Sequence, residues 1–308
     1  MADYSEFSDE ASVSRMTNEN GNRPWHAETT RSIFDISQEV CATSLSEGQL
    51  SESVERINAI LDAQGQISEV FSRDAKDDLY SSVEFRLDPT YHDEGGHIDQ
   101  AQRVILKDGS LSWLKPSYGE TAAREGIEAG SGVLRSLSTF EIDRALGLGV
   151  VPEVRLVRTE LGDASLQSHA ADAGRLVHQY DDVDVQRMAV LDYVTGQTDR
   201  HEDNYRSTDS GRPAAIDNGL CLSSSENDSI QSDFVVQSFN EELNSYLLQG
   251  VREASRDDLS ATLERIGIDK AIVAGAMARL DEIGENGRIT GRAWSGHIYS
   301  GDRRNMIK

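Results

Sequence analysis

The sequence is poor in cysteine and contains no long apolar run. Its two cysteines, Cys41 and Cys221, have neither the spacing of a metal-binding pair nor that of a disulfide framework, so each is expected to pack as a small buried hydrophobe. No window approaches the 18 consecutive apolar residues of a membrane-spanning helix. The first residues, MADYSEFSDEASVSRM, lack the basic start and the apolar stretch of a secretory signal. These absences favour a cytoplasmic protein without a membrane segment.

Positive charge is also scarce. The 308 residues contain 54 acidic and 30 basic side chains, giving a formal net charge of -24, and only five of the basic residues are lysine. A dense carboxylate surface stays soluble in concentrated salt, which screens its self-repulsion, so the composition resembles that of a salt-adapted proteome. A GC-rich genome would also favour arginine over lysine. We expect no docking on nucleic acid or on anionic membranes through charge.

The predicted elements place strands before helices. Residues 1 to about 45 are polar and weakly periodic, and the next segment, SEGQLSESVERINAILDAQ, has the spacing of an amphipathic helix. A mainly helical segment is expected after Ser229. This order favours an α+β fold class with two unequal lobes. Between these ends, the patterns predict strands at 81–91, 102–110, 111–117 and 150–157, and helices at 132–149 and 182–194.

The segment VLDYVTGQTDRHEDNYRS, which includes the end of the second of these helices, is rich in polar groups. Asp199 and Asn204 have the spacing Asp-x-x-x-x-Asn, with which a kinase catalytic loop provides a base for the substrate hydroxyl and a metal ligand. Asp217 precedes Asn218 and Gly219, as a metal-binding Asp-x-Gly motif requires. The apolar residues PAAI before it predict a short strand that delivers Asp217 to the same site.

Phosphoryl transfer also needs a cation on the phosphates. Lys115 stands within the predicted strand SLSWLKPS, upstream of the acidic and amide groups, which is the order that a kinase requires. The alternative is an edge lysine whose stem lies along apolar surface. In a chain with only five lysines, a lysine inside an apolar strand is not expected to be a mere surface residue. Together with the order of the three motifs, this favours a lysine that contacts phosphate.

With TGQTDRHEDN and AIDNG, the chain resembles the atypical kinases related to phosphatidylinositol 3- and 4-kinases, whose catalytic loop reads Asp-Arg-His-x-x-Asn. It resembles in particular their prokaryotic members and the secretory-pathway kinases, over roughly residues 95 to 222. The resemblance implies a bilobal protein-kinase-like fold. A small β-rich N-lobe would cover residues 76–180 and a helical C-lobe 181–308, with an N-terminal extension over 1–75.

The resemblance also implies a role for each residue of the loop. Asp199 would be the catalytic base, accompanied by Arg200 and His201, and His201 would support the loop or the transferring phosphate. Asn204 and Asp217 would bind Mg²⁺ or Mn²⁺. The metal-binding groups of the family are therefore all present in this sequence.

The nucleotide-binding groups are less complete. Lys115 would contact the α- and β-phosphates of ATP, but kinases pair this lysine with a glutamate of the following helix. Where the family carries that acid, this chain has Ser136, and Glu141 and Glu128 are the nearest substitutes. The loop that would cover the phosphates offers only one glycine pair, Gly95 and Gly96.

Two functions remain open at this point. The first is ATP-dependent phosphoryl transfer to a hydroxyl, with a protein Ser/Thr preferred over a lipid because the surface is acidic, and a small alcohol or sugar as the next choice. The second is a degenerate kinase fold that serves as a structural component of a larger assembly. In that case a partner would order residues 1–45. The alternative is that these residues wrap the chain's own lobes.

Overall fold

The computed structural model describes residues 77–91, 101–118, 120, 124–159, 162–170, 172–224, 228–301 and 306–308. The chain divides into two units, Met1–Gln66 and Ile67–Lys308, and every described residue belongs to the second. The predictions for Cys41, for the glycine pair Gly95 and Gly96, and for the N-terminal extension lie outside the described residues.

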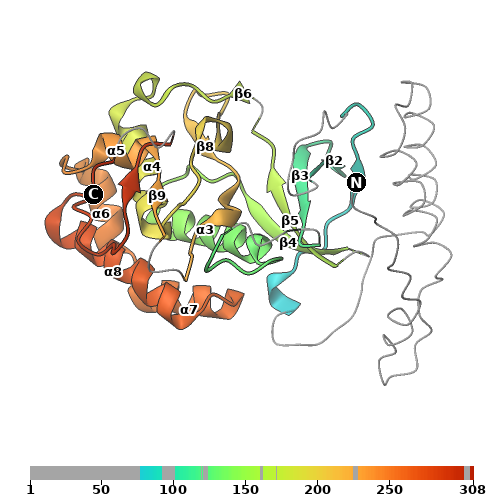
Figure 1. Ribbon diagram of the computed structural model, residues 1–308. Helices are drawn as coiled ribbons and strands as arrows, with labels where there is room; N and C mark the ends of the chain where they lie inside the picture. The colour runs from blue at the N-terminus through green and yellow to red at the C-terminus, as the bar shows by residue number, and fades with distance from the viewer. Residues whose placement is uncertain are drawn as a thin grey trace, which may run out of the picture. The chain divides into compact units, whose positions relative to one another are not determined.

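The small lobe is an antiparallel sheet with the strand order β1-β2-β3-β5-β4 (Figure 1). A short 3-10 turn, η2 (Asp77–Leu79), precedes it, and Tyr80 then bridges to Leu156 of β4. The strands are β1 (Phe85–Leu87), β2 (Gln102–Leu106), β3 (Leu111–Pro116), β4 (Val154–Thr159) and β5 (Gly162–Ser168).

A tight turn joins β2 to β3, so the strand predicted at 102–110 ends at Leu106. Gly109 adopts a φ of 86°, which costs a residue without a side chain little, and Asp108 accepts a hydrogen bond from the Ser110 backbone at 2.9 Å. This turn sets the register between β2 and β3, in which Gln102 pairs with Leu114. On the other side of β3, Lys115 pairs with Ser165 of β5. Residues 81–91 form a shorter strand than predicted, since only three of them pair with β2.

One helix, α3 (Gly132–Leu146), packs against β4 and β5. It ends at Leu146, inside the predicted range 132–149, because the next residue, Gly147, adopts the left-handed conformation with φ 65°. The carboxylate of Asp143 then accepts hydrogen bonds from the backbone of Val150 at 2.8 Å and of Val151 at 3.3 Å. Because these two residues bond to the helix, β4 begins at Val154 rather than at 150 as predicted.

The large lobe is mainly helical, as expected. Helix α4 is its centre, because all seven residues from Met188 to Val194 are fully buried. This burial on every side explains why α4 is not amphipathic in sequence. The helices are α4 (Asp182–Thr195), α5 (Asp233–Ser238), α6 (Ser245–Glu253), α7 (Arg256–Ile266) and α8 (Lys270–Asn286).

Short strands and turns carry the polar segments of this lobe. The three-stranded antiparallel sheet consists of β6 (Asp172–Ala173), β7 (Tyr205–Ser207) and β8 (Pro213–Ala215). A parallel pair consists of β9 (Ile230–Gln231) and β10 (Ile298–Tyr299). The 3-10 turns are η3 (Val177–Gln179), η4 (Glu202–Asn204) and η5 (Asn218–Leu220). Together these elements confirm the predicted two-lobed α+β class.

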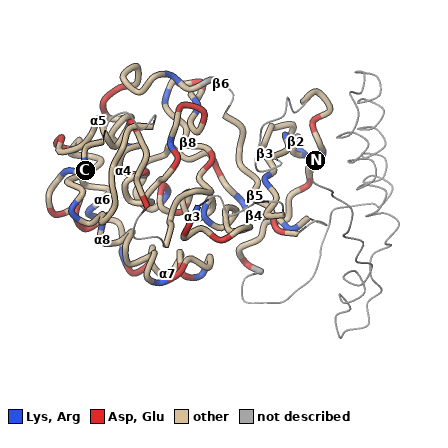
Figure 2. The backbone as a smooth tube through the Cα atoms, viewed as in Figure 1, with Lys and Arg blue, Asp and Glu red and all other residues tan. Residues whose placement is uncertain are grey.

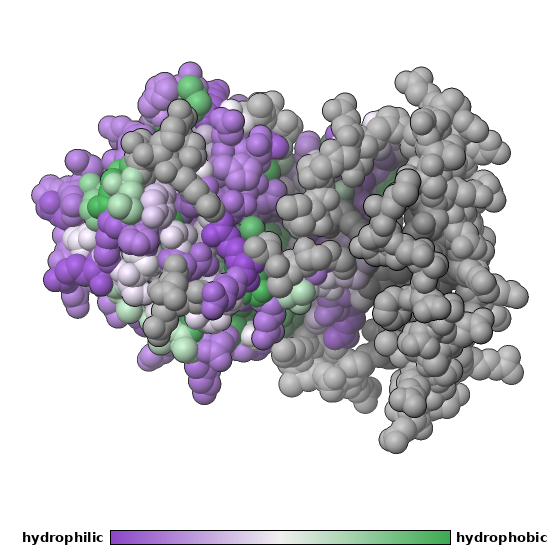
Figure 3. Space-filling view, in the orientation of Figure 1, coloured by the Kyte–Doolittle hydropathy of each residue, from purple (hydrophilic) through white to green (hydrophobic). Residues whose placement is uncertain are grey.

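The surface of the described part is strongly polar. Acidic and basic residues occur along the loops and helices of both lobes (Figure 2), and the visible face is mostly hydrophilic with small, separate hydrophobic areas (Figure 3). Within the described ranges, no helix has the length and apolar character needed to cross a membrane.

Candidate active site

The loop that follows α4 is fixed by backbone hydrogen bonds to two later segments. Thr198 donates from its backbone to Leu220 at 3.2 Å, and Arg200 donates to Gln231 at 2.9 Å. Between these anchors, the side chain of Asp199 keeps 28% of its surface exposed. The loop therefore presents a carboxylate to solvent from a rigid backbone.

Asn204 closes the loop onto Asp199. Its Nδ2 donates to the Asp199 backbone oxygen at 2.7 Å and lies 3.3 Å from Asp199 Oδ2. Both partners can only accept, so these contacts fix which end of the amide is nitrogen. Within the described residues, no hydrogen bond to Asn204 Oδ1 is found. That oxygen is therefore left for a cation.

Asp217 reaches the same place from β8, as the PAAI pattern predicts. The backbone of Ile216 donates to Asn204 at 3.2 Å, which joins the two segments. Asp217 itself adopts a left-handed backbone with φ 53°. This conformation is strained for a residue other than glycine, and such backbone strain is concentrated at functional sites, where it orients a side chain.

Lys115 and Asp217 form an ion pair between the two lobes. The lysine comes from β3, and its side chain is 15% exposed, whereas that of the aspartate is 35% exposed. The structure thus brings together the four groups that the sequence singled out, one from the small lobe and three from the large lobe. Burial of the lysine also disfavours the alternative of an edge residue.

Arg200, grouped above with the catalytic residues, has a fully buried side chain. Its Nη2 lies 3.0 Å from Asp192 Oδ1 on α4 and donates to Asn218 Oδ1 at 2.7 Å. Its Nη1 donates to the backbone oxygens of Asn204 and, at 2.6 Å, of Ile216. The guanidinium thus holds together α4, the Asp199–Asn204 loop and the Asp217 segment.

His201 lines the edge of the loop and is 38% exposed on its side chain. Its Nε2 lies 3.0 Å from Asn204 Nδ2 and 3.8 Å from Asp199 Oδ2. The imidazole can therefore support the positions of both side chains.

The acid expected on the helix after β3 is not supplied by either of the named substitutes. Glu141 pairs with Arg144 on the same helix, and Glu128 lies exposed before the helix begins. Ser136, at the position of the missing acid, is buried. A carboxylate that sequence reasoning missed, Glu120, accepts a hydrogen bond from the first backbone N–H of α3 at 2.9 Å.

Aromatic rings gather on the face of β3 that carries Lys115. Trp113 lies two residues earlier and therefore on the same face. Its indole N–H donates to His169 Nδ1 at 2.8 Å, and its ring stands edge-on to Tyr91 at 5.0 Å. Burial lowers the pKa of His169, and the nearby guanidinium of Arg103 adds to this effect. Sequence reasoning missed this cluster, because its rings come from three separated segments.

Arg124 was also missed, although it contacts the candidate base. Its Nη2 lies 3.8 Å from Asp199 Oδ1, and its Nη1 lies 3.3 Å from Asp228 Oδ1. The arginine stands in a polar loop without periodicity, so no local pattern distinguishes it from a solvated residue.

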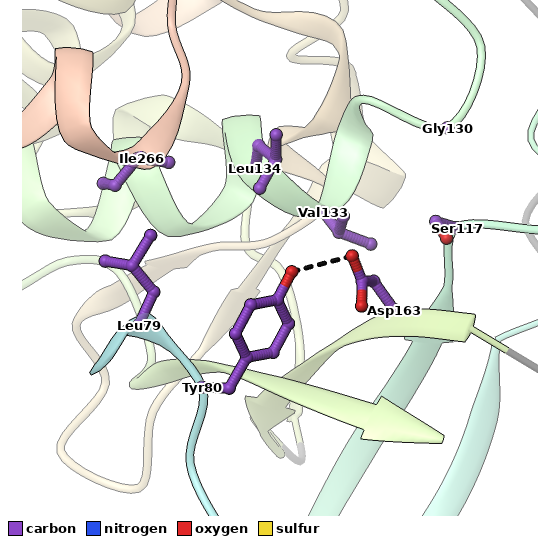
Figure 4. A pocket seen from close by; sticks show the side chains of 8 residues that line it. All are labelled: Leu79, Tyr80, Ser117, Gly130, Val133, Leu134, Asp163 and Ile266. Atoms are coloured by element: carbon purple, nitrogen blue, oxygen red, sulfur yellow. Dashed lines mark hydrogen bonds between the residues drawn. The ribbon is translucent and has the colours of Figure 1, made fainter. Parts of the chain in front are cut away.

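A cavity of about 190 Å³ lies apart from these groups (Figure 4). Tyr80 donates to Asp163 Oδ2 at 2.7 Å on one side, and Leu79, Leu134 and Ile266 form an apolar side. Burial, assisted by Asp163, raises the pKa of Tyr80 to about 12. None of the candidate catalytic residues lines this cavity.

Cys221 lies between α3 and the Asp217 segment and is fully buried, as its sequence predicts. Its Sγ lies 3.1 Å from Thr139 Oγ1 and donates to the Asn218 backbone oxygen at 3.0 Å. Burial raises the pKa of the thiol. This cysteine therefore packs as a small hydrophobe.

A metal ion at this site would need ligands beyond the protein. Over the described residues, no group of three or more His, Cys, Asp or Glu side chains could hold one. Asp217 and the free oxygen of Asn204 supply two oxygen donors. Mg²⁺ is typically bound by one or two such groups together with substrate phosphates and water, so the donor set fits that ion when a nucleotide is present.

The family model for phosphatidylinositol 3- and 4-kinases matches residues 38–237, which is more than half of the chain. No curated protein matches significantly. Among solved structures, a Helicobacter pylori proinflammatory kinase is 12% identical, with a TM-score of 0.42, and the match covers 66% of this chain and 96% of that one. The Golgi casein kinase with Mn/ADP bound is 13% identical, with a TM-score of 0.44, over 88% and 92% of the two chains.

Proposed function

The chain belongs to the phosphatidylinositol 3- and 4-kinase family, and we propose that it transfers the terminal phosphoryl group of ATP to a hydroxyl group. One observation carries the proposal. Lys115 of the small lobe meets Asp217 of the large lobe, directly beside the Asp199–Asn204 loop. Phosphoryl transfer depends on such positioning and charge more than on covalent chemistry by the protein.

Asp199 is the proposed base. The acceptor hydroxyl gives its proton to the Asp199 carboxylate while its oxygen forms a bond to the γ-phosphorus. The bond between that phosphorus and the β,γ-bridging oxygen breaks, and its electron pair leaves with ADP. The rigid anchors of the loop keep Asp199 in place, so little reorganisation is needed.

Lys115, Asn204 and Asp217 are the proposed phosphate and metal ligands. In the free protein, Lys115 and Asp217 neutralise each other. When a nucleotide binds, Lys115 would contact its phosphates instead of Asp217. The Asp217 carboxylate and Asn204 Oδ1 would then bind a divalent cation. That cation would neutralise phosphate charge and so favour departure of ADP.

The nucleotide base is expected to lie against Trp113. Two residues of a β-strand span about 6.6 Å, so Trp113 lies about that far along β3 from Lys115, the proposed phosphate ligand. An aromatic ring stacks well on a nucleobase and does not require a particular base. His169, which accepts the indole hydrogen bond, would hold this platform in place.

For the acceptor, we propose a serine or threonine of a protein, with a small alcohol or sugar as the next choice. The net charge of -24 disfavours an anionic membrane substrate. A basic peptide near the hydroxyl would be attracted by the same surface.

The test uses the purified full chain with ATP and either Mg²⁺ or Mn²⁺, at low and at high salt, and measures ADP release and phosphate incorporation. Asp217→Ala should abolish both signals. Asp209→Ala is the matched control, because Asp209 is exposed on the turn between β7 and β8. Equal turnover by wild type and Asp217→Ala would reject the proposal.

A second candidate is a kinase fold that binds nucleotide but no longer transfers phosphate. The observation that favours it is Ser136, which stands where the family carries an acid on the helix. Metal-dependent nucleotide binding without turnover, on every acceptor class tested, would select this candidate. Its role would then be that of an assembly component.

A further inference from the structure

The loop that follows β3 is fastened onto the segment that follows Asp217. The Ser224 backbone donates to the Gly126 oxygen at 3.0 Å, and its hydroxyl donates to the same oxygen at 3.2 Å. The Ser223 hydroxyl donates to Glu125 at 3.4 Å. Residues 124–126 of the small lobe are therefore held at a fixed place over the large lobe.

From this place, Arg124 reaches between two carboxylates. Its Nη2 lies 3.8 Å from Asp199 Oδ1, its Nη1 lies 3.3 Å from Asp228 Oδ1, and its side chain is only 19% exposed. The ion pair with Asp228 thus fixes the position of the Arg124 side chain, and the Nη2 group of the guanidinium faces Asp199, the candidate base.

Asp228 is well suited to orient this arginine. Its side chain is 9% exposed, and Oδ1 also accepts from the Ser229 backbone at 2.9 Å. Its Oδ2 is buried and has no hydrogen-bond partner among the described residues. A buried carboxylate with an unused oxygen is costly without a nearby cation, so the Asp228 charge depends on Arg124.

We propose that Arg124 is a catalytic residue that binds the transferring phosphoryl group, and that Asp228 is its positioning residue. The inference rests on the proposed function. The acceptor hydroxyl must approach within about 3 Å of Asp199, and the γ-phosphorus is bonded to that oxygen as transfer proceeds. A guanidinium that already lies beside Asp199 is in reach of the equatorial oxygens of that phosphorus.

The arginine adds positive charge at the transferring phosphoryl group, beyond that of Lys115 and the divalent cation. As the bond to the acceptor oxygen forms and the bond to the β,γ-bridging oxygen breaks, negative charge remains on the three equatorial oxygens, and the hydroxyl proton passes to Asp199. An arginine that stabilises such charge contributes about 10³-fold or more to kcat. Its planar donor fork also matches phosphate better than a lysine does.

The first experiment measures the affinities of the full chain for ATP and for ADP with Mg²⁺ by titration calorimetry. Wild type should prefer ATP, and Arg124→Ala should lose most of this preference, because only ATP carries the γ-phosphate. Arg155→Ala is the matched control, since Arg155 pairs with Glu153 on the exposed side of β4. Unchanged ATP preference in Arg124→Ala would overturn the inference.

The second experiment separates this role from a purely structural one. In Arg124→Ala, kcat should fall about 10³-fold with little change in KM for the acceptor, and Arg124→Lys should recover only part of it. Asp228→Asn should reduce the ATP preference partially at an unchanged melting temperature. Equal weakening of ATP and ADP together with a lower melting temperature would overturn the inference.

These readouts also distinguish the inference from the proposed function. A chain that prefers ATP through Arg124 but never turns over rejects the phosphotransferase proposal alone. A chain that turns over ATP but keeps its kcat in Arg124→Ala rejects the inference alone.

Discussion

Arg200 and Asp192 form an ion pair in which neither side chain has any exposed surface, with 3.0 Å between Nη2 and Oδ1. Asp192 Oδ2 also accepts a hydrogen bond from Ser232 at 2.7 Å. Helix α4, the Asp199–Asn204 loop and the start of α5 therefore meet at one charged pair. Removing one partner of a pair that is shielded from solvent destabilises the fold, because the other charge is then buried without a counter-charge.

Replacing Arg200 by Met should therefore destabilise the fold by roughly 3–5 kcal/mol. The measurement is the free energy of unfolding by urea at neutral pH. The matched control is Arg265→Met, whose pair with Asp78 is more than half exposed on both sides and should contribute less than about 1 kcal/mol. Similar losses in the two variants would contradict the prediction.

Lys115→Met should abolish phosphate transfer and weaken ATP binding, because the phosphates lose their cation while Asp217 is left without its partner. Lys107→Met is the matched control, since Lys107 is exposed on the β2–β3 turn and pairs with Glu84. Calorimetric titration with ATP and Mg²⁺ checks both variants. Wild-type affinity in Lys115→Met would remove this lysine from the site.

Trp113→Ala should weaken the binding of ATP, ADP and adenosine by a similar factor, because stacking acts on the base and not on the phosphates. A loss of 1–3 kcal/mol, roughly 5- to 150-fold in affinity, is expected for one stacked base. Trp113→Phe should retain much of the affinity, and Tyr246→Ala, at an exposed position on α6, should retain all of it. A loss confined to ATP would point to a phosphate effect instead.

Asp143 should make stability depend on pH. Burial raises the pKa of this carboxyl to about 6. The hydrogen bonds that it accepts from the backbone N–H groups of Val150 and Val151 lower the pKa, but by less than burial raises it. Between about pH 4 and 6, the folded state then binds a proton that the unfolded state has released. The stability contribution of Asp143 is therefore largest below pH 4 and is lost as the pH rises through 6.

Asp143→Asn removes this titration and keeps an oxygen that can accept from Val150. The free energy of unfolding of the variant, relative to wild type, should rise by roughly 3 kcal/mol between pH 4 and 7, at about 1.4 kcal/mol per pKa unit. Urea titrations of both proteins across that range check the prediction. A constant difference between the two would contradict it.

The sequence predicts those parts of the site that depend on local spacing. Asp199 and Asn204 lie within one short loop, and the PAAI strand ends beside Asp217, so their convergence follows from nearby residues. The end of α3 at Gly147 is equally local. Lys115 could be placed because β2 and β3 are joined by a four-residue turn that the Asp108–Gly109 pair marks.

The remaining features depend on contacts between distant segments. Strand β5 has the sequence GDASLQS, without a β-branched or aromatic residue, and is a strand because it pairs with β3 and β4 on either side. Arg124 and Asp228 lie 104 positions apart, and only the folded chain brings them to Asp199. The sequence did not reveal Glu120 either, whose carboxylate accepts a hydrogen bond from the first residue of α3 although it lies 12 positions before it.

The buried thiol of Cys221 makes the protein its own reporter of local opening between α3 and the Asp217 segment. The thiol is sealed between Thr139 of α3 and the Asp217 segment, so an alkylating reagent can reach it only when these two parts separate. In a Cys41→Ser background, the labelling rate relative to that of a free thiol gives the free energy of this local opening. Nucleotides that bridge the two lobes should slow the labelling, which would allow ligands to be ranked without any assay of phosphate transfer.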